Sequence, residues 1–319
     1  MTPVATPVAL SASSWDAALE ETLSGGSRAQ PHSTAPVAVA AGTHGAVHSV
    51  HGRVVNLRVG DGLIALAHES LDDAPWTVRL HAADWSALSG ARVGDDVRIT
   101  RDALSLSGGA LVRVLLAPDG ARSLTPDAGV PVGLPAALAV LDGVPSPAAS
   151  TPFGALAADA LSVGIRRLTR TARALLDGEP DAAEATTTAA LRLLGLGEGL
   201  TPSGDDVLSG LAFVAAHPGF GLTALRHPLR LVAESAEQRT TLLSAVTLSA
   251  ALEGRARARL HDLVGAIIAG DERAIHRAAA HTAEIGHTSG HDLLTGIRLG
   301  VVLALDIPRP SPFTEGDHR

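Results

Sequence analysis

The chain of 319 residues contains no cysteine, no tyrosine and no lysine, so all 25 of its basic residues are arginines. Without thiols there is no cysteine nucleophile, no cysteine-ligated zinc site and no disulfide framework. Without lysine amines there is no Schiff base for pyridoxal phosphate and no phosphate-binding lysine of the P-loop type. Any catalysis must therefore use Asp, Glu, His, Ser, Thr, Arg and backbone amides.

Aromatic residues and positive charge are also scarce. Aromatics make up 2% of the chain and the formal net charge is −8, whereas a nucleic-acid-binding protein needs a basic surface and stacking rings. No positively charged stretch precedes Val8–Leu10, and the apolar run Val301–Leu305 is far shorter than the ~20 residues that span a bilayer. We expect a globular cytoplasmic protein with neither nucleic-acid nor membrane partners.

The period of the hydrophobic pattern divides the chain into two domains. Over residues 34–120, short alternating segments separated by glycine turns predict an antiparallel β sandwich or a small barrel. Residues 151–308 show helical periodicity and predict a mainly α-helical domain, so the expected fold class is α+β. We interpret the remaining parts as a flexible N-terminal segment (1–33), a linker (121–150) and a polar tail (309–319).

The same pattern predicts individual elements. Strands are expected within 48–59, 63–67, 76–80, 96–100 and 110–116. Short helices are expected within 15–23 and 134–141. The helical domain is expected to contain helices over 156–176, 182–194, 206–216, 222–252, 257–269, 272–285 and 291–305.

The most specific motif is a glycine-rich stretch from Gly195 to Asp206, which reads GLGEGLTPSGDD. Glycines at every second position do not pack as a helix, but they let backbone amides approach a ligand closely. The chain then enters a helix, with Ser203 and Asp206 at the spacing of a capping box. Such a loop is a ready anion site, because the free N–H groups and the helix dipole point the same way.

Part of this motif recurs 86 residues later, since Ser203–Gly210 reads SGDDVLSG and Ser289–Gly296 reads SGHDLLTG. Both copies are expected to begin a helix, and each places a glycine on the second helical turn, where it permits close helix–helix approach. We predict that the two helix N-termini converge on one site in a pseudo-symmetric arrangement. The alternative is that each copy is only a helix cap.

These motifs resemble the signatures of the AllH-type family, which is associated with the oxamate carbamoyltransferase of allantoin degradation. The resemblance rests mainly on residues 195–206 and 286–292, with weaker similarity at 49–57 and 240–245. It implies a subunit that acts with a succinyl-CoA-synthetase-like subunit and a third subunit. The implied reaction transfers a carbamoyl group from oxalurate to phosphate and gives oxamate and carbamoyl phosphate.

All these reactants are anions, and carbamoyl transfer requires oxyanion stabilisation and positioning more than redox or thiol chemistry. The candidate catalytic residues are Asp205, Asp206, His287 and Asp292, and either Asp205 or Asp206 is also a candidate Mg²⁺ ligand. The candidate substrate-binding residues are Gly197, Gly199, Thr201, Ser203, Gly204, Thr241, Ser244, Ser289 and Gly290.

Two further polar groups have alternative interpretations. His287 and His291 have a spacing that can bind a metal on a helix, but the pair is expected to straddle a helix start and lacks a third ligand. We therefore interpret His287 as a hydrogen-bond donor to substrate. The arginines between Arg166 and Arg173 form either a solvated helix face or an anion clamp.

Two other functions stay open. The chain could be a non-catalytic structural or small-carboxylate-binding subunit that stabilises its partners. It could also be a metal-dependent amidohydrolase-like enzyme, which the His and Asp residues of the second motif copy would serve. Binding of oxamate by the isolated chain without turnover would favour the first of these alternatives.

Overall fold

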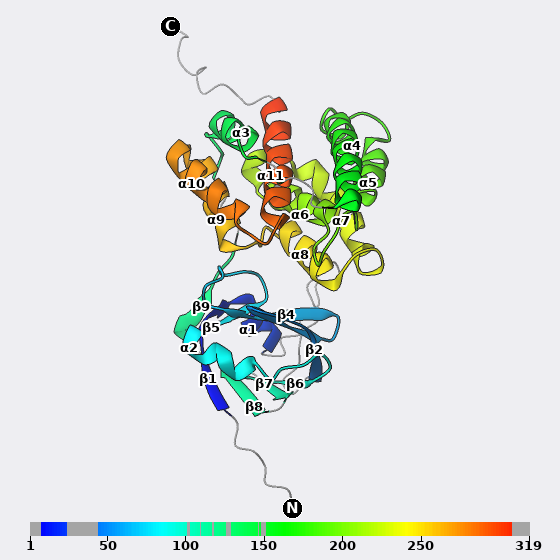
Figure 1. Ribbon diagram of the computed structural model, residues 1–319. Helices are drawn as coiled ribbons and strands as arrows, with labels where there is room; N and C mark the ends of the chain where they lie inside the picture. Colours follow the sequence, from blue (N-terminus) through cyan, green and yellow to red (C-terminus); the bar gives the residue numbers. More distant parts are fainter. Residues whose placement is uncertain are drawn as a thin grey trace, which may run out of the picture.

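The computed structural model describes residues 8–23, 44–100, 103–108, 110–116, 118–125, 129–145, 147 and 151–307. A β barrel is followed by a helical domain, and Figure 1 shows the two stacked end to end. The expected α+β class, with a barrel-like β domain before a mainly helical domain, is confirmed. The tail 309–319 lies outside the described residues.

The barrel is built from short strands with few helices between them. Its elements are β1 (Val8–Asp16), α1 (Ala18–Leu23), β2 (His44–His51), β3 (Val54–Val59), β4 (Gly62–His68), β5 (Thr77–Leu80), α2 (Ala82–Trp85), β6 (Asp96–Thr100), β7 (Ala103–Gly108), β8 (Ala110–Leu115) and β9 (Ala121–Arg122). Among the described residues, eight strands close in the order β5-β4-β3-β2-β6-β7-β8-β1, because β1 also pairs with β5, and β9 extends the sheet beside β1. Most neighbours are antiparallel, but β1–β8, β1–β9 and β4–β5 are parallel.

The interior of the barrel follows from the two-residue period of its strands. In β6, Val97 and Ile99 are buried while Asp96 and Arg98 are exposed. Buried branched side chains such as Leu57, Leu66 and Val78 fill the rest of the interior. Alternation in the sequence therefore identified most strands, although it missed β1, β7 and the short β9.

The N-terminal segment corrects the expected domain boundary, because β1 is an integral strand of the barrel and not part of a flexible segment. It buries Leu10, Ala12 and Trp15, and it closes the barrel by pairing with both β5 and β8. Trp15 lies in this strand, so the short helix begins only at Ala18. The rest of residues 1–33 lies outside the described residues.

The helical domain contains α3 (Leu134–Asp142), α4 (Pro152–Leu176), α5 (Ala182–Leu191), α6 (Ser203–Ala215), α7 (Arg226–Glu234), α8 (Leu242–Leu252), α9 (Ala258–Ala269), α10 (Glu272–Ala283) and α11 (Ser289–Asp306). Helix α6 is buried from Gly204 to Ala215 and forms the centre of the domain. None of the described helices is long and apolar enough to cross a membrane.

Two expectations about this domain need correction. The predicted helix over 222–252 is two helices, because Thr241 ends the intervening segment and caps α8 by accepting a hydrogen bond from the Ser244 N–H. The predicted linker contains α3, as expected, but Ala137 and Leu141 of α3 are buried in the helical core. The helical domain therefore begins before residue 151.

Arg255 joins the two domains. Its guanidinium forms an ion pair with Asp16 and lies 4.0 Å from the centroid of the Trp76 ring. Asp16 also accepts hydrogen bonds from the backbone N–H groups of Ala18 and Trp76, at 3.1 and 2.7 Å. A second bridge lies nearby, where Arg257 Nη1 is 2.9 Å from Asp72 Oδ1.

Candidate functional site

Helices α6 and α11 pack against each other in parallel, so that both N-termini lie at the same end of the pair. Gly210 faces Leu293 and Gly296 faces Val207, and a Cβ on either glycine would lie 2.2 or 2.1 Å from the facing carbonyl oxygen. In Figure 1 the N-terminal end of α11 lies on the side of the helical domain that faces the barrel. The predicted convergence of the two motif copies, and the close approach at their glycines, are confirmed.

Side chains at the two N-termini pair crosswise between the motif copies. The Ser203 hydroxyl interacts with Asp292 and the Ser289 hydroxyl with Asp206, and each lowers the pKa of that carboxyl group. The Oγ atoms of Thr201 and Ser289 are 2.8 Å apart. Each serine therefore interacts with the carboxyl group of the other helix.

The predicted capping box of Ser203 and Asp206 is wrong, because Ser203 is not the N-cap residue of α6. Helix α6 has Pro202 as its N-cap residue and α11 has Thr288, and neither makes a side-chain capping hydrogen bond. The carbonyl oxygens of these two residues accept equivalent backbone hydrogen bonds, from Asp206 N–H at 3.3 Å and from Asp292 N–H at 3.0 Å. Capping alone does not explain the repeat, because its serine hydroxyls bind across the helix pair.

Asp206 is almost completely buried at this crossing, with 4% of its surface exposed. Burial raises the pKa of Asp206 to about 8, partly offset by hydrogen bonds from Ser289 and Thr201 and reinforced by the charge of Asp292. Its Oδ2 atom is buried and has no hydrogen-bond partner within the described chain. At neutral pH Asp206 is therefore a neutral acid with an unmatched oxygen.

Asp292 occupies the equivalent position on α11 and is partly buried. Burial raises the pKa of Asp292, against hydrogen bonds from Ser203 and Thr288 and the charge of His291. Its Oδ2 atom is also buried without a partner among the described residues. The two carboxyl groups thus form a pair with two unmatched oxygens between two helix N-termini.

Asp205 has a different environment, although it is adjacent in sequence and 1% exposed. Its Oδ1 accepts a hydrogen bond from the Gly195 N–H at 2.7 Å, and its Oδ2 accepts one from the Thr240 hydroxyl. Both oxygens are occupied, so this carboxyl group anchors the start of the glycine loop to the segment before α8.

The glycine loop presents backbone amides at the N-terminus of α6. Gly197 and Gly199 have φ values of +128° and +92°, which other residues rarely adopt. Their N–H groups have no acceptor within residues 151–307. A Cβ at Gly197 would lie 2.6 Å from the Ser203 nitrogen, so only glycine leaves that approach open.

Two other glycines of the motifs have a different role. The N–H of Gly204 donates to Leu196 O at 2.8 Å, and that of Gly290 donates to Ile285 O at 2.9 Å. A Cβ at these positions would lie 2.0 Å from Leu193 O or 2.1 Å from Thr282 O. These amides are therefore not free donors for an anion, and the two glycines serve close packing.

Thr241 and Ser244 lie beside the loop, at the start of α8. The Thr241 hydroxyl donates to Leu200 O at 2.7 Å and accepts from the Ser244 N–H at 3.1 Å. It therefore ties the glycine loop to α8. The hydroxyl oxygen of Ser244 is buried and has no partner in the described part of the chain.

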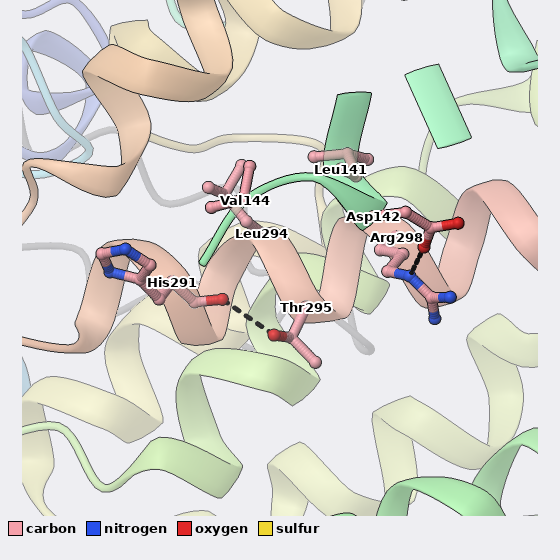
Figure 2. A pocket seen from close by; sticks show the side chains of 7 residues that line it. All are labelled: Leu141, Asp142, Val144, His291, Leu294, Thr295 and Arg298. Atoms are coloured by element: carbon pink, nitrogen blue, oxygen red, sulfur yellow. Dashed lines mark hydrogen bonds and ion pairs between the residues drawn. The ribbon is translucent and has the colours of Figure 1, made fainter. Parts of the chain in front are cut away.

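The two histidines of the second motif copy flank the first residue of α11. His287 is exposed and precedes the start of α11. His291 lines a pocket of about 260 Å³ between α3 and α11, and Figure 2 shows its ring pointing away from Arg298 at the other end of that pocket. Arg298 is ion-paired with Asp142, so the pocket has little free positive charge.

Two of the arginines of α4 have partners away from the crossing. Arg166 Nη1 donates to Ser162 on the same helix at 2.6 Å, and Arg173 Nε lies 2.7 Å from Asp306 Oδ2. Asp306 ends α11, about 21 Å along the helix axis from Asp292 at 1.5 Å per residue. These contacts are typical of a solvated helix face.

Sequence reasoning missed Thr288, which interacts with Asp292 and lowers its pKa. It placed Gly195 in the glycine-rich stretch but did not predict that Gly195 and Thr240 bind Asp205. The 86-residue offset aligns Thr288 with Pro202, which has no hydroxyl, so the repeat itself hides Thr288. The described residues contain no group of three or more His, Asp or Glu side chains that could hold a metal ion.

Comparison with known families covers both domains. The model of the AllH family N-terminal domain matches residues 14–119, and the model of the oxamate carbamoyltransferase subunit AllH matches residues 193–301. No solved structure matches the chain. The second match contains both copies of the motif and the first contains most of the barrel. The chain therefore belongs to the AllH family of oxamate carbamoyltransferase subunits.

Proposed function

We propose that this chain is the subunit of an oxamate carbamoyltransferase in which oxalurate and phosphate react, at the paired N-termini of α6 and α11. The single observation that carries the proposal is the unmatched, buried Oδ2 of Asp206 beside the free amides of the glycine loop. A buried polar atom without a partner costs stability, so we infer that a ligand supplies the partner.

The electrostatics of the crossing favour anions. Two parallel helices direct the positive ends of their dipoles toward the same point, and the amides of Gly197 and Gly199 add donors there. A carboxylate at this point would repel an anionic substrate, but a raised pKa keeps Asp206 neutral. Neutral Asp206 can donate a hydrogen bond to a substrate oxygen or a proton to a leaving nitrogen.

The proposed step conserves atoms and charge. An oxygen of hydrogen phosphate forms a bond to the carbamoyl carbon of oxalurate, and the bond from that carbon to the oxamate nitrogen breaks. The nitrogen takes a proton from Asp206, while the Asp292 carboxylate accepts the proton that hydrogen phosphate loses. Transfer of a proton from Asp292 to Asp206 then restores the starting state. The reverse reaction exchanges the two roles.

Other residues position these groups. We assign Asp205, whose oxygens are both occupied, to anchoring the glycine loop, and Thr241 to holding that loop against α8. Because the family name describes a subunit, we propose that the chain works in a cytoplasmic complex with a succinyl-CoA-synthetase-like subunit and a third subunit.

The test is Asp206→Asn in the assembled enzyme, assayed by formation of oxamate from oxalurate and phosphate. We expect kcat/KM to fall by about 10²–10⁴-fold, the usual contribution of a positioned acid. Asp177→Asn, an exposed aspartate at the end of α4, is the matched control and should leave the activity unchanged. Full activity in Asp206→Asn, with oxamate still bound, would instead indicate a carboxylate-binding subunit without a catalytic role.

A further inference from the structure

We infer that the two copies of the motif are two half-sites, one for each reactant. The loop Gly197–Leu200 binds the tetrahedral phosphate, and the loop Gly286–Ser289 binds the planar carboxylate of oxalurate or oxamate. This inference rests on the proposed function and goes beyond it, because it assigns each anion to its own helix N-terminus.

The two N-termini are nearly equivalent. Each has a left-handed glycine whose missing Cβ faces the first serine of its helix, Gly197 toward Ser203 and Gly286 toward Ser289. Each serine interacts with the aspartate of the other helix. Two nearly equivalent helix N-termini at one crossing can hold two anions side by side.

A pair of carboxyl groups lies at the two N-termini. Asp206 and Asp292 each have a buried oxygen without a partner in the described chain, and each interacts with a serine from the opposite copy. A neutral acid between two bound anions reduces their mutual repulsion. The carbamoyl group would then transfer at this midpoint, where either reactant reaches it.

The two loops differ, and the difference assigns the ligands. The connection before α6 (residues 192–202) is longer than the one before α11 (residues 284–288), and its glycines at 197 and 199 have positive φ, as in backbone cradles for phosphate. The second connection has one glycine and carries the exposed imidazole of His287. A planar carboxylate needs fewer donors and is complemented by the amides and that ring.

The experiment uses the full chain with phosphate and oxamate, which cannot react with each other because neither carries a transferable carbamoyl group. Calorimetric titration of each anion is carried out alone and in the presence of a saturating concentration of the other. We expect one phosphate and one oxamate to bind per chain. The Kd of each anion should change by less than about threefold, or about 0.65 kcal/mol, when the other anion is saturating.

Matched glycine substitutions then assign the half-sites. Gly197→Ala should raise the Kd of phosphate at least tenfold and leave the Kd of oxamate within threefold of the wild-type value. Gly286→Ala should do the reverse. Gly199→Ala, whose Cβ would enter open space, repeats the first test with less steric conflict. Gly178→Ala, at φ +75° beyond α4 and without close neighbours, controls for backbone strain alone.

Each outcome decides the inference. Competition between the anions, or equal weakening of both by one substitution, would overturn the two half-sites and leave the proposed function standing. The opposite pattern, with Gly197→Ala weakening only oxamate, would overturn the assignment of ligands. If neither anion binds the wild-type chain, the proposed function fails together with the inference.

Discussion

Asp16 at the domain junction and Asp206 at the α6–α11 crossing are buried to the same extent, at 3% and 4% exposed. Asp16 has a guanidinium against it and accepts two backbone N–H groups. Among the groups that shift the pKa of Asp206 there is no cation, only two hydroxyls and two carboxyl groups. One buried aspartate is thus paired with a cation, whereas the other is buried without one.

This difference distinguishes a structural role from a functional one. A buried carboxylate that is paired and hydrogen-bonded holds two parts of a structure together, and removing its partner is costly. A buried carboxyl group with an unmatched oxygen has no such stabilising role, and burial drives it to its neutral form. We therefore assign the junction around Asp16 to holding the domains together, and the crossing around Asp206 to chemistry.

The largest effect of a single substitution on stability is expected at the junction. Arg255→Ala leaves Asp16 buried without its counter-charge and should lower the free energy of unfolding by about 3–5 kcal/mol. Urea unfolding followed by tryptophan fluorescence measures this directly, because Trp15, Trp76 and Trp85 all lie in the barrel. Arg257→Ala removes a more exposed ion pair and should cost less than about 1 kcal/mol. Equal losses in the two variants would contradict the comparison.

The next effect concerns the anchor of the glycine loop. Asp205→Ala leaves the Gly195 N–H and the Thr240 hydroxyl without their acceptor, and it should cost about 2–4 kcal/mol in thermal unfolding followed by circular dichroism. Thr240→Val removes only one of the two hydrogen bonds and should cost about 1 kcal/mol. A wild-type stability in Asp205→Ala would show that the carboxyl group does not anchor the loop.

For Asp206 we expect the stability of the folded protein to depend on pH and to fall as the pH rises. Its folded-state pKa is raised from 3.8 to about 8, so the folded state binds the proton more tightly than the unfolded state. The resulting stability is fully present below pH 3.8 and is lost as the pH rises to about 8, at up to about 1.4 kcal/mol per pH unit.

Asp206→Asn should reduce this decline, so that the variant is more stable than the wild type at pH 8. Urea unfolding at a series of pH values measures it, with Asp177→Asn as the exposed control. An unchanged pH dependence in Asp206→Asn would place the titrating group elsewhere.

The smallest effect tests the crosswise pairing. Ser203→Ala and Ser289→Ala should each cost less than about 1 kcal/mol, because neither hydroxyl caps its own helix. Ser289→Ala should raise the pKa of Asp206 further, and Ser203→Ala that of Asp292, since each loses a hydrogen bond to its charged form. Carbon-13 NMR titration of the aspartate carboxyl groups gives the result. A shift of the aspartate on the same helix instead would contradict the pairing.

Local pattern in the sequence was enough for some of these features. The recurrence of serine, aspartate and glycine after 86 residues predicted the meeting of α6 and α11, because glycine on a helix surface is a local signature of close packing. The pattern did not predict the crosswise interactions of Ser203 with Asp292 and of Ser289 with Asp206. Ser203 and Asp206 also fit a capping box, and the choice between these partners depends on a helix far away in sequence.

The errors in the fold have a similar origin. Strand β1 is rich in small residues and resembles a tail, and its pairing with β5 and β8 is long-range. The break between α7 and α8 is hidden because apolar periodicity continues on both sides of it. In both cases the deciding contacts are tertiary.

The sequence by itself determined the available chemistry. A chain without cysteine, tyrosine or lysine relies on backbone amides, hydroxyls, arginines and carboxyl groups, and its glycines predict where those amides lie. Only the tertiary structure distinguished Asp205 from Asp206. The two are adjacent and identical in type, but successive side chains on a helix point about 100° apart. One therefore meets the anchors of the glycine loop, while the other meets α11, where burial without a cation makes it an acid.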